Sequence, residues 1–213
     1  KRQVHTQVNV MTHIAKARKQ RGAKLIVIDP YRTPTAEVAD IHIMPRPGTD
    51  GALAAAMINV FFRDGHADWD YMREFTDAPD ELARHVAHKT PEWAAEITGL
   101  DAAEIETLSS IYAETERAFI RIGYGFTRSR NGAANMHAVT CLPSVTGKWK
   151  RKGAGALYSN AGVYPLDMTM IMGLDVCDKS TRLLDQSRLG PILVVRVSTY
   201  ARVEGKVWGG GGR

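Results

Sequence analysis

Polar side chains follow two short apolar segments of this 213-residue sequence, at the points where each segment ends. The stretch DPYRT comes directly after the run KLIVI, and the stretch PGTD comes shortly after the run IHIMP. A carboxylate at such a position can accept hydrogen bonds from a ribose hydroxyl or from the N–H groups of a guanine. The two loops, with Asp29, Pro30, Tyr31, Arg32 and Thr33 in the first and Gly48, Thr49 and Asp50 in the second, are therefore candidates for a ligand contact.

Each of these two loops also has an interpretation without a ligand. An Asp-Pro pair after a strand is typical of a turn or a helix cap, and PGTD is typical of a helix start. The combination of the loops favours a site, because the carboxyl ends of neighbouring parallel strands lie at one edge of a sheet. Asp29 and Asp50 would then belong to a single polar rim.

A third loop, GYGFTRSRNG, follows the apolar run AFIRI. Gly125 permits a tight turn, Tyr124 could stack on a ring, and Arg128 could face a phosphate. The spacing is not the dinucleotide-binding fingerprint, whose third glycine would be needed where Arg128 stands. The basic run at residues 148–152 could bind anions, although such runs are more often solvated loops.

Other kinds of chemistry have little support. His85 and His88 lie three positions apart without nearby metal-ligating partners, so a metal site is not expected. Cys141 lies on the apolar side of a predicted helix, which favours a core position over a nucleophile. Two separated cysteines exclude a disulfide scaffold and a zinc ribbon. The sequence contains no P-loop and no recognisable Ser/His/Asp spacing.

The hydrophobic pattern predicts alternating helices and strands, and hence an α/β fold with a mostly parallel, Rossmann-like sheet flanked by helices. Strands KLIVIDP and AFIRIGYGF read as buried on both faces. Predicted helices cover residues 8–21, 34–40, 50–64, 69–75, 79–88, 91–97, 101–116 and 133–146, and further strands cover 41–45 and 191–197. The last residues, 198–213, finish in glycines followed by Arg213 and predict a flexible, added tail.

The composition, with 44% hydrophobic residues and a net charge of +5, predicts a soluble globular protein that attracts anions. No stretch approaches the roughly 18 consecutive apolar residues of a membrane helix. Membrane insertion is therefore not expected, and neither is a secretory signal. We expect a cytoplasmic location, with the periplasm as the alternative because the start of the natural protein is expected to be missing.

Several of these motifs occur in one order that resembles a known family. Residues 17–65 (ARKQRGAKLIVIDPYRTPTAEVADIHIMPRPGTDGALAAAMINVFFRDG) are similar to the catalytic subunits of the molybdopterin oxidoreductases, the dimethyl sulfoxide reductase family. Residues 88–113 and 123–155 resemble the segments that follow in that family. The resemblance reaches to about Pro191, and several linked motifs are more specific than any one of them.

The resemblance implies a molybdenum or tungsten ion held by two pterin guanine dinucleotides, that is, molybdenum bis(molybdopterin guanine dinucleotide). Residues 29–33 and 48–50 would line a guanosine end, while Tyr124, Gly125 and Arg128 would approach the pterin. Arg128 stands where the family often has glutamine. The family's cysteine motif for a 4Fe-4S cluster, its metal-ligating side chain and its C-terminal domain are not in this sequence, so the chain alone would bind no cluster and be inactive.

The expected organisation is an incomplete part of a multidomain enzyme. Residues 1–118 would form part of a dinucleotide-cofactor-binding domain, 119–197 would begin a second such domain, and 198–213 would be a tail. Expected partners are a small-molecule substrate, the remaining domains of the enzyme and an electron-transfer subunit, but no nucleic acid. The alternatives are a basic α/β module that binds nucleic acid or other phosphorylated ligands, and a structural fragment with no site.

Overall fold

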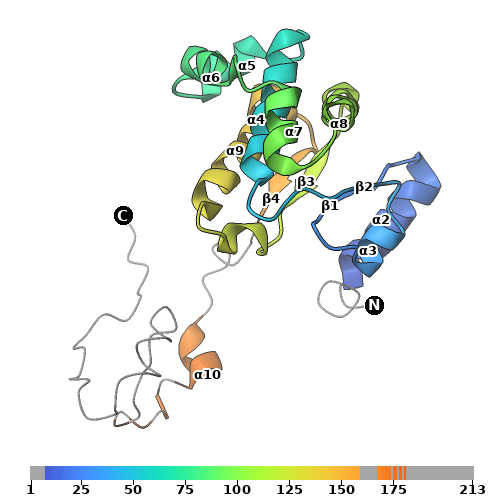
Figure 1. Cartoon of the computed structure of the whole chain (residues 1–213). Helices are drawn as coiled ribbons and strands as arrows, with labels where there is room; N and C mark the ends of the chain where they lie inside the picture. The colour runs from blue at the N-terminus through green and yellow to red at the C-terminus, as the bar shows by residue number, and fades with distance from the viewer. Residues whose placement is uncertain (1–7, 159–166, 174, 177, 179, 181–213) are drawn as a thin grey trace. The chain divides into compact units, whose positions relative to one another are not determined.

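The computed structural model describes residues 8–158, 167–173, 175, 176, 178 and 180. The chain divides into two compact units, residues 1–162 and residues 163–213. The first unit holds the predicted loops and alternates helices with short strands (Figure 1). In the second unit the described helix is α10 (Met168–Met172), where Asp167 caps the first turn by accepting a hydrogen bond from the Thr169 amide. The sequence pattern did not predict α10.

The elements of the first unit follow one another with short connections, as the hydrophobic pattern predicted. They are α2 (Val8–Arg21), β1 (Ile26–Ile28), α3 (Pro34–Glu37), β2 (Ile41–Ile43), α4 (Asp50–Arg63), α5 (Trp69–Phe75), α6 (Pro79–Val86), α7 (Pro91–Thr98), α8 (Ala102–Glu114), β3 (Phe119–Arg121), the 3-10 turn η1 (Phe126–Arg128), α9 (Gly132–Val145), the 3-10 turn η2 (Lys148–Lys150) and β4 (Gly155–Leu157). Strand β4 was not predicted, because its glycine-rich segment has no strand pattern.

Local capping signals explain where the helices begin. The Thr33 side chain accepts a hydrogen bond from the Ala36 amide, and Pro34 occupies the first position of α3. Asp68 caps α5 and Thr90 caps α7 in the same way. The sequence left the N-cap of α4 open between Thr49 and Asp50, and the structure places Thr49 there. These helix starts could be predicted because each depends on residues within one turn.

The strands form two parallel pairs, which confirms the α/β class. In the first pair, β1 and β2 align Ile26 with Ile41; in the second, β3 and β4 align Phe119 with Gly155. The prediction that the first and third strands are buried on both faces is wrong for the described residues, since Ile28 is 44% exposed and Phe119 is 51% exposed. Each described sheet has two strands, and so small a sheet leaves part of its surface uncovered.

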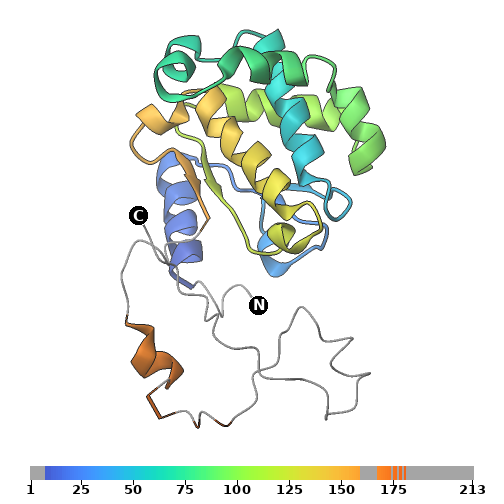
Figure 2. The ribbon, with the colours of Figure 1, turned by 90° about the vertical axis from the view of Figure 1, so that its left-hand side faces the viewer.

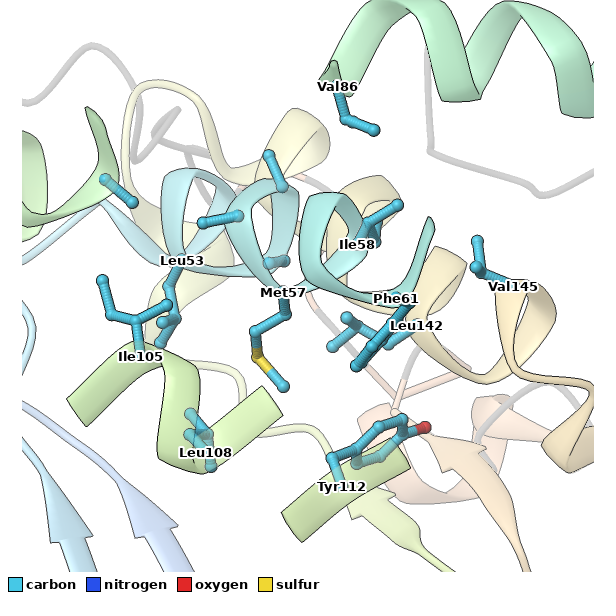
Figure 3. Close-up of a cluster of buried hydrophobic side chains, with 14 of the residues drawn as sticks. Leu53, Met57, Ile58, Phe61, Val86, Ile105, Leu108, Tyr112, Leu142 and Val145 are labelled. Atoms are coloured by element: carbon cyan, nitrogen blue, oxygen red, sulfur yellow. The ribbon is translucent and has the colours of Figure 1, made fainter. Parts of the chain in front are cut away.

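The hydrophobic core of the first unit is built around α4. Leu53, Met57 and Phe61 of this helix face α8, and Leu142 and Val145 approach from α9 (Figure 3). A rotated view shows α4 and α9 side by side (Figure 2), in agreement with the contacts between them. Small residues at 54, 55 and 56 allow other helices to approach α4 closely. The core therefore fixes α4, and with it the loop that precedes it.

Two predicted features lie outside the described residues. These are the strand at residues 191–197 and the tail at 198–213. The domain boundaries predicted after residues 118 and 197 stay predictions. Across the described residues, every helix is too short or too polar to traverse a lipid bilayer.

Candidate functional site

The first predicted loop begins where β1 ends, and Asp29 is held there from both sides. Its amide donates a hydrogen bond to the Ile43 carbonyl at 3.1 Å, which extends the pairing with β2. Its Oδ1 atom accepts from the Tyr31 amide at 2.9 Å, and its carbonyl lies 2.9 Å from Nε2 of His42. The backbone turn thus uses one carboxylate oxygen, and Oδ2 has no hydrogen-bond partner among the described residues.

The other residues of this loop are arranged around the turn. Tyr31 is 72% exposed, and Pro30 and Arg32 are also exposed. Thr33 uses its hydroxyl to cap α3. The capping interpretation of the sequence therefore holds for Thr33, while Tyr31 and Arg32 present a ring and a guanidinium to the exterior.

The second loop, residues 47–50, turns the chain into α4. Gly48 has a φ of 82°, a left-handed conformation that glycine adopts without strain. The Thr49 hydroxyl donates to the Arg46 carbonyl at 2.6 Å, so it stabilises the turn instead of capping the helix. Asp50 is the first residue of α4 and is half-buried.

The structure brings the carboxylates of these two loops together. Partial burial raises the pKa of Asp50, and the negative charge of Asp29 raises it further. A charge acts on another in this way only at short range, because water screens more distant pairs. Asp29, which follows β1, and Asp50, which begins α4, are thus placed so that the charge of one acts on the other. That these two acidic groups form a single polar rim for a ligand stays a prediction.

The third loop follows β3 and contains η1. The rings of Tyr124 and Tyr158 pack with centroids 4.8 Å apart, and the Thr127 hydroxyl donates to the Tyr124 carbonyl at 2.9 Å. The Arg128 amide donates to the Gly125 carbonyl at 3.2 Å, which closes the turn, and the Arg128 side chain is exposed. Tyr124 is thus packed against Tyr158, which follows β4, while the Arg128 side chain is exposed.

Two asparagines that the sequence reasoning missed connect the second and third loops. Nδ2 of Asn131 donates to the Gly48 carbonyl at 3.0 Å, and Nδ2 of Asn135 donates to the same carbonyl at 3.3 Å. Oδ1 of Asn135 accepts from the Gly51 amide at 3.1 Å. The signal that could have indicated them is the pair of asparagines four positions apart in RNGAAN, on one face of a helix start.

The loops carry two kinds of hydrogen-bonding group, carboxylate acceptors and guanidinium donors. Asp29 and Asp50 offer carboxylate oxygens, which accept hydrogen bonds and repel a phosphate. A guanine edge or a ribose supplies the matching N–H and O–H donors. The exposed guanidinium groups of Arg32 and Arg128 are the groups suited to an anion. No cluster of three metal-ligating side chains occurs among the described residues.

The basic run at residues 148–152 has a different role from either one considered in the sequence. Lys148 is 5% exposed, and its Nζ donates to the carbonyls of Ala113 and Thr115 at 2.9 and 2.6 Å. It thereby caps the C-terminal end of α8, where a positive charge is favourable. Lys150 pairs with Asp68 at 2.6 Å. The sequence predicted either a solvated loop or an anion site for this run. Lys148 is neither, because its ammonium group is buried and donates to backbone carbonyls.

Cys141 packs against the core, as the sequence indicated. Cys141 is half-buried against the core, and burial raises the pKa of its thiol, which keeps it protonated. His85 lies in α6, and His88 follows the end of that helix. The core position predicted for Cys141 is confirmed.

These features define an α/β protein with acidic and basic loops gathered at the carboxyl ends of parallel strands. A family model for the molybdopterin oxidoreductases matches residues 3–187. The chain belongs to the molybdopterin oxidoreductase family, as its motifs predicted.

Individual relatives agree with this assignment. The probable oxidoreductase YoaE of Bacillus subtilis is 35% identical over 192 residues, which cover 90% of this chain and 28% of that protein. The F420-dependent formate dehydrogenase subunit alpha of Methanocaldococcus jannaschii is 37% identical over 137 residues, 64% of this chain and 20% of that subunit. The solved structure of acetylene hydratase from Pelobacter acetylenicus matches 65% of this chain and 19% of its own length, with 34% identity and a TM-score of 0.59. The chain thus spans less than a third of each of these relatives.

Proposed function

We propose that this chain forms part of a molybdenum- or tungsten-dependent oxidoreductase and binds the guanosine end of its pterin guanine dinucleotide cofactor. The observation that carries the proposal is the proximity of Asp29 and Asp50, which arise from two loops and share one rim. When bound, the metal of such a cofactor passes oxygen atoms or electrons to a small substrate. The part of this chain is to bind and orient the nucleotide.

In this proposal the two carboxylates have related tasks. Oδ2 of Asp29, which has no partner among the described residues, accepts from a nucleoside donor, while Oδ1 keeps the turn closed through the Tyr31 amide. Asp50 accepts from a second donor. Ligand N–H groups would supply the hydrogen bonds that a half-buried carboxylate loses when it leaves water, which stabilises its charged form.

The surrounding residues complete the proposed contact. The exposed ring of Tyr31 can cover one face of a base, and Gly48 lets backbone approach the ligand without a side chain in the way. Arg32 and Arg128 supply positive charge for the phosphates. Tyr124 and Gly125 shape the third loop, and Pro30, Thr33 and Thr49 hold the backbone of the first two. The iron–sulfur cluster, the small substrate, the electron-transfer subunit and the cytoplasmic location stay predictions for the whole enzyme.

Binding of free nucleotides to the chain tests this function. Calorimetric titration with guanosine, inosine and adenosine monophosphates should give the order guanosine, then inosine, then adenosine. Inosine lacks the 2-amino donor of guanine, and adenosine presents an acceptor where guanine has N1–H. Asp50→Asn and Asp29→Asn should each abolish the preference for guanosine, because an amide cannot accept at both terminal atoms. Equal affinity of the unaltered chain for guanosine and adenosine monophosphates would refute the proposal.

The alternative of a nucleic-acid-binding module has less support in the contacts. Lys148 is occupied by the end of α8, Lys150 by Asp68, and Arg151 lies 3.5 Å from Glu116. A nucleic-acid surface needs several cations that can each displace a counterion. Affinity for DNA that falls steeply with increasing salt, in the absence of any nucleotide preference, would favour this alternative.

A further inference from the structure

Asn135 is a buried polar residue that brackets the turn carrying Asp50. Its side chain is 2% exposed. It accepts a hydrogen bond from the Gly51 amide at 3.1 Å and donates one to the Gly48 carbonyl at 3.3 Å. Gly48 and Gly51 stand on either side of Thr49 and Asp50, so one side chain from α9 holds both ends of this turn.

The start of α4 packs so closely against Asn135 that a side chain on Gly51 would not fit. A Cβ atom on Gly51 would lie 2.6 Å from Oδ1 of Asn135 and 3.4 Å from its Cα atom. The start of α4 therefore reaches α9 at a distance that only glycine permits. Asn131 adds a second donor to the Gly48 carbonyl and also donates to Oδ1 of Asn135 at 3.3 Å. The bracket is thus a connected network with its acceptors satisfied.

Because Asp29 and Asp50 both carry negative charge, the hydrogen bonds of Asn135 to Gly48 and Gly51 do more than pack two helices together. Asp29 and Asp50 repel each other, and a half-buried carboxylate gains hydration by moving toward water. Both effects push the turn at residues 48–51 away from β1. A restraint on each side of Asp50 opposes that movement, and Asn135 supplies both restraints.

We propose that Asn135 is a positioning residue, which holds the Asp50 carboxylate beside Asp29 and thereby sets the preference of the site for guanine. The inference deepens the proposed function and rests on it for the identity of the ligand. The geometric part, that Asn135 holds the turn carrying Asp50 through Gly48 and Gly51, stands on the contacts of this chain alone.

A purely structural role for Asn135 makes different predictions, and Asn59 provides the matched control. Asn59 lies on the same helix, α4, is 9% exposed, and donates through Nδ2 to the carbonyls of Val86 and Ala87 at 2.9 and 3.1 Å. Asn59→Ala removes two hydrogen bonds between a buried amide and backbone, as Asn135→Ala does. It does so away from Asp50, so the two variants should lower the melting temperature similarly.

The first measurement is the ratio of affinities for guanosine and inosine monophosphates, well below the melting temperature of each variant. Asn135→Ala should reduce this ratio about tenfold, equivalent to ~1.4 kcal/mol, because the acceptor for the 2-amino group moves. Asn135→Asp keeps the acceptor for the Gly51 amide but cannot donate to Gly48, and it should also reduce the ratio. Asn59→Ala should leave the ratio unchanged.

The second measurement is the titration midpoint of the Asp50 carboxyl carbon, followed by nuclear magnetic resonance in the 213-residue chain without nucleotide. Among the described residues, Asp29 is the charged group that acts on Asp50. Asn135→Ala should lower the midpoint, as Asp29→Asn does, whereas Asn59→Ala should not. If Asn135→Ala does not fold, Asn135→Asp, which has nearly the same shape, takes its place in the affinity measurement, and the uncharged Asn135→Ser takes its place in the titration, because a new carboxylate would itself raise the Asp50 midpoint.

These two measurements separate the inference from the function on which it rests. An Asp50 midpoint that stays at the unaltered value in the uncharged Asn135 variant would overturn the positioning role, whatever the nucleotide data show. A chain without preference between guanosine and inosine monophosphates would overturn the proposed function, and the midpoint alone would then decide the role of Asn135.

Discussion

Burial raises the pKa of Asp50 and the carboxylate of Asp29 raises it further, although the two residues come from different loops. One follows β1 and the other begins α4, and the chain between them forms α3 and β2. Two like charges at short range cost stability unless a partner stands between them. The relationship therefore connects the stability of the first unit to the ligand that its rim is proposed to bind.

Replacing Asp50 by asparagine should stabilise the chain at neutral pH. The raised pKa means that the folded state binds protons more tightly than the unfolded state, whose carboxyl titrates near the usual 3.8. Stability is therefore lost as the pH rises from that value through the pKa of folded Asp50. Asp50→Asn should unfold at a higher urea concentration than the unaltered chain at pH 7, with a gain below about 1 kcal/mol, and the gain should vanish toward pH 3.

Asp64 provides the control of opposite sign. Its hydrogen bond with the Arg63 guanidinium lowers the pKa of this carboxyl below its usual value. The ion pair therefore stabilises the fold above the usual carboxyl pKa and is lost on acidification. Asp64→Asn should unfold more easily at pH 7, and a gain in stability from both variants would contradict this account.

Lys148 should be a large single contributor to stability among the basic residues. Lys148→Met keeps the apolar stem but leaves the carbonyls of Ala113 and Thr115 without their donor. Because these carbonyls are only part-buried, the cost should lie toward the lower end of the about 1–3 kcal/mol of an unsatisfied buried acceptor. Guanidinium denaturation should show this loss, whereas Lys150→Met, which removes a partly exposed pair with Asp68 and a cation–π contact with Tyr71, should cost less. Similar losses from both variants would argue against the capping role.

Gly51→Ala should be destabilising, contrary to the usual effect of this change in a helix. Gly51 lies within α4, where replacing glycine by alanine would normally add about 0.5–1 kcal/mol of stability. Here the new Cβ would lie 2.6 Å from Oδ1 of Asn135, and overpacking of this kind costs about 1–3 kcal/mol. A double-mutant cycle with Asn135→Ala should show coupling, since removal of the amide relieves the clash. Gly123→Ala, where nothing lies within 4 Å, should change stability by less than about 0.5 kcal/mol.

Cys141 should react slowly with thiol reagents in the folded chain. Burial raises the pKa of its thiol, and the protonated form is a poor nucleophile. In a Cys177→Ser background, Ellman's reagent should modify Cys141 much more slowly in buffer than in 6 M guanidinium. Equal rates in the two conditions would show that the thiol is open to solvent.

The sequence by itself determined the features that depend on neighbours along the chain. The Thr33 cap with Pro34, the start of α4 after Thr49 and the start of α8 after Asp101 were predicted because capping involves residues within a single turn. The ordered motifs also determined the family, which the match over residues 3–187 confirms. The candidate loops followed from the same local reading, and their role in binding stays a proposal.

Only the tertiary structure decided which of these residues meet. The Gly51 amide and Asn135 are 84 positions apart, and Lys148 reaches the Thr115 carbonyl across 33 positions. Such pairings depend on how α4, α8 and α9 pack around a shared core, and no local period in the sequence encodes them. For the same reason the sequence could name Asp29 and Asp50 as acids at two strand ends, while the fold placed their charges within reach of each other.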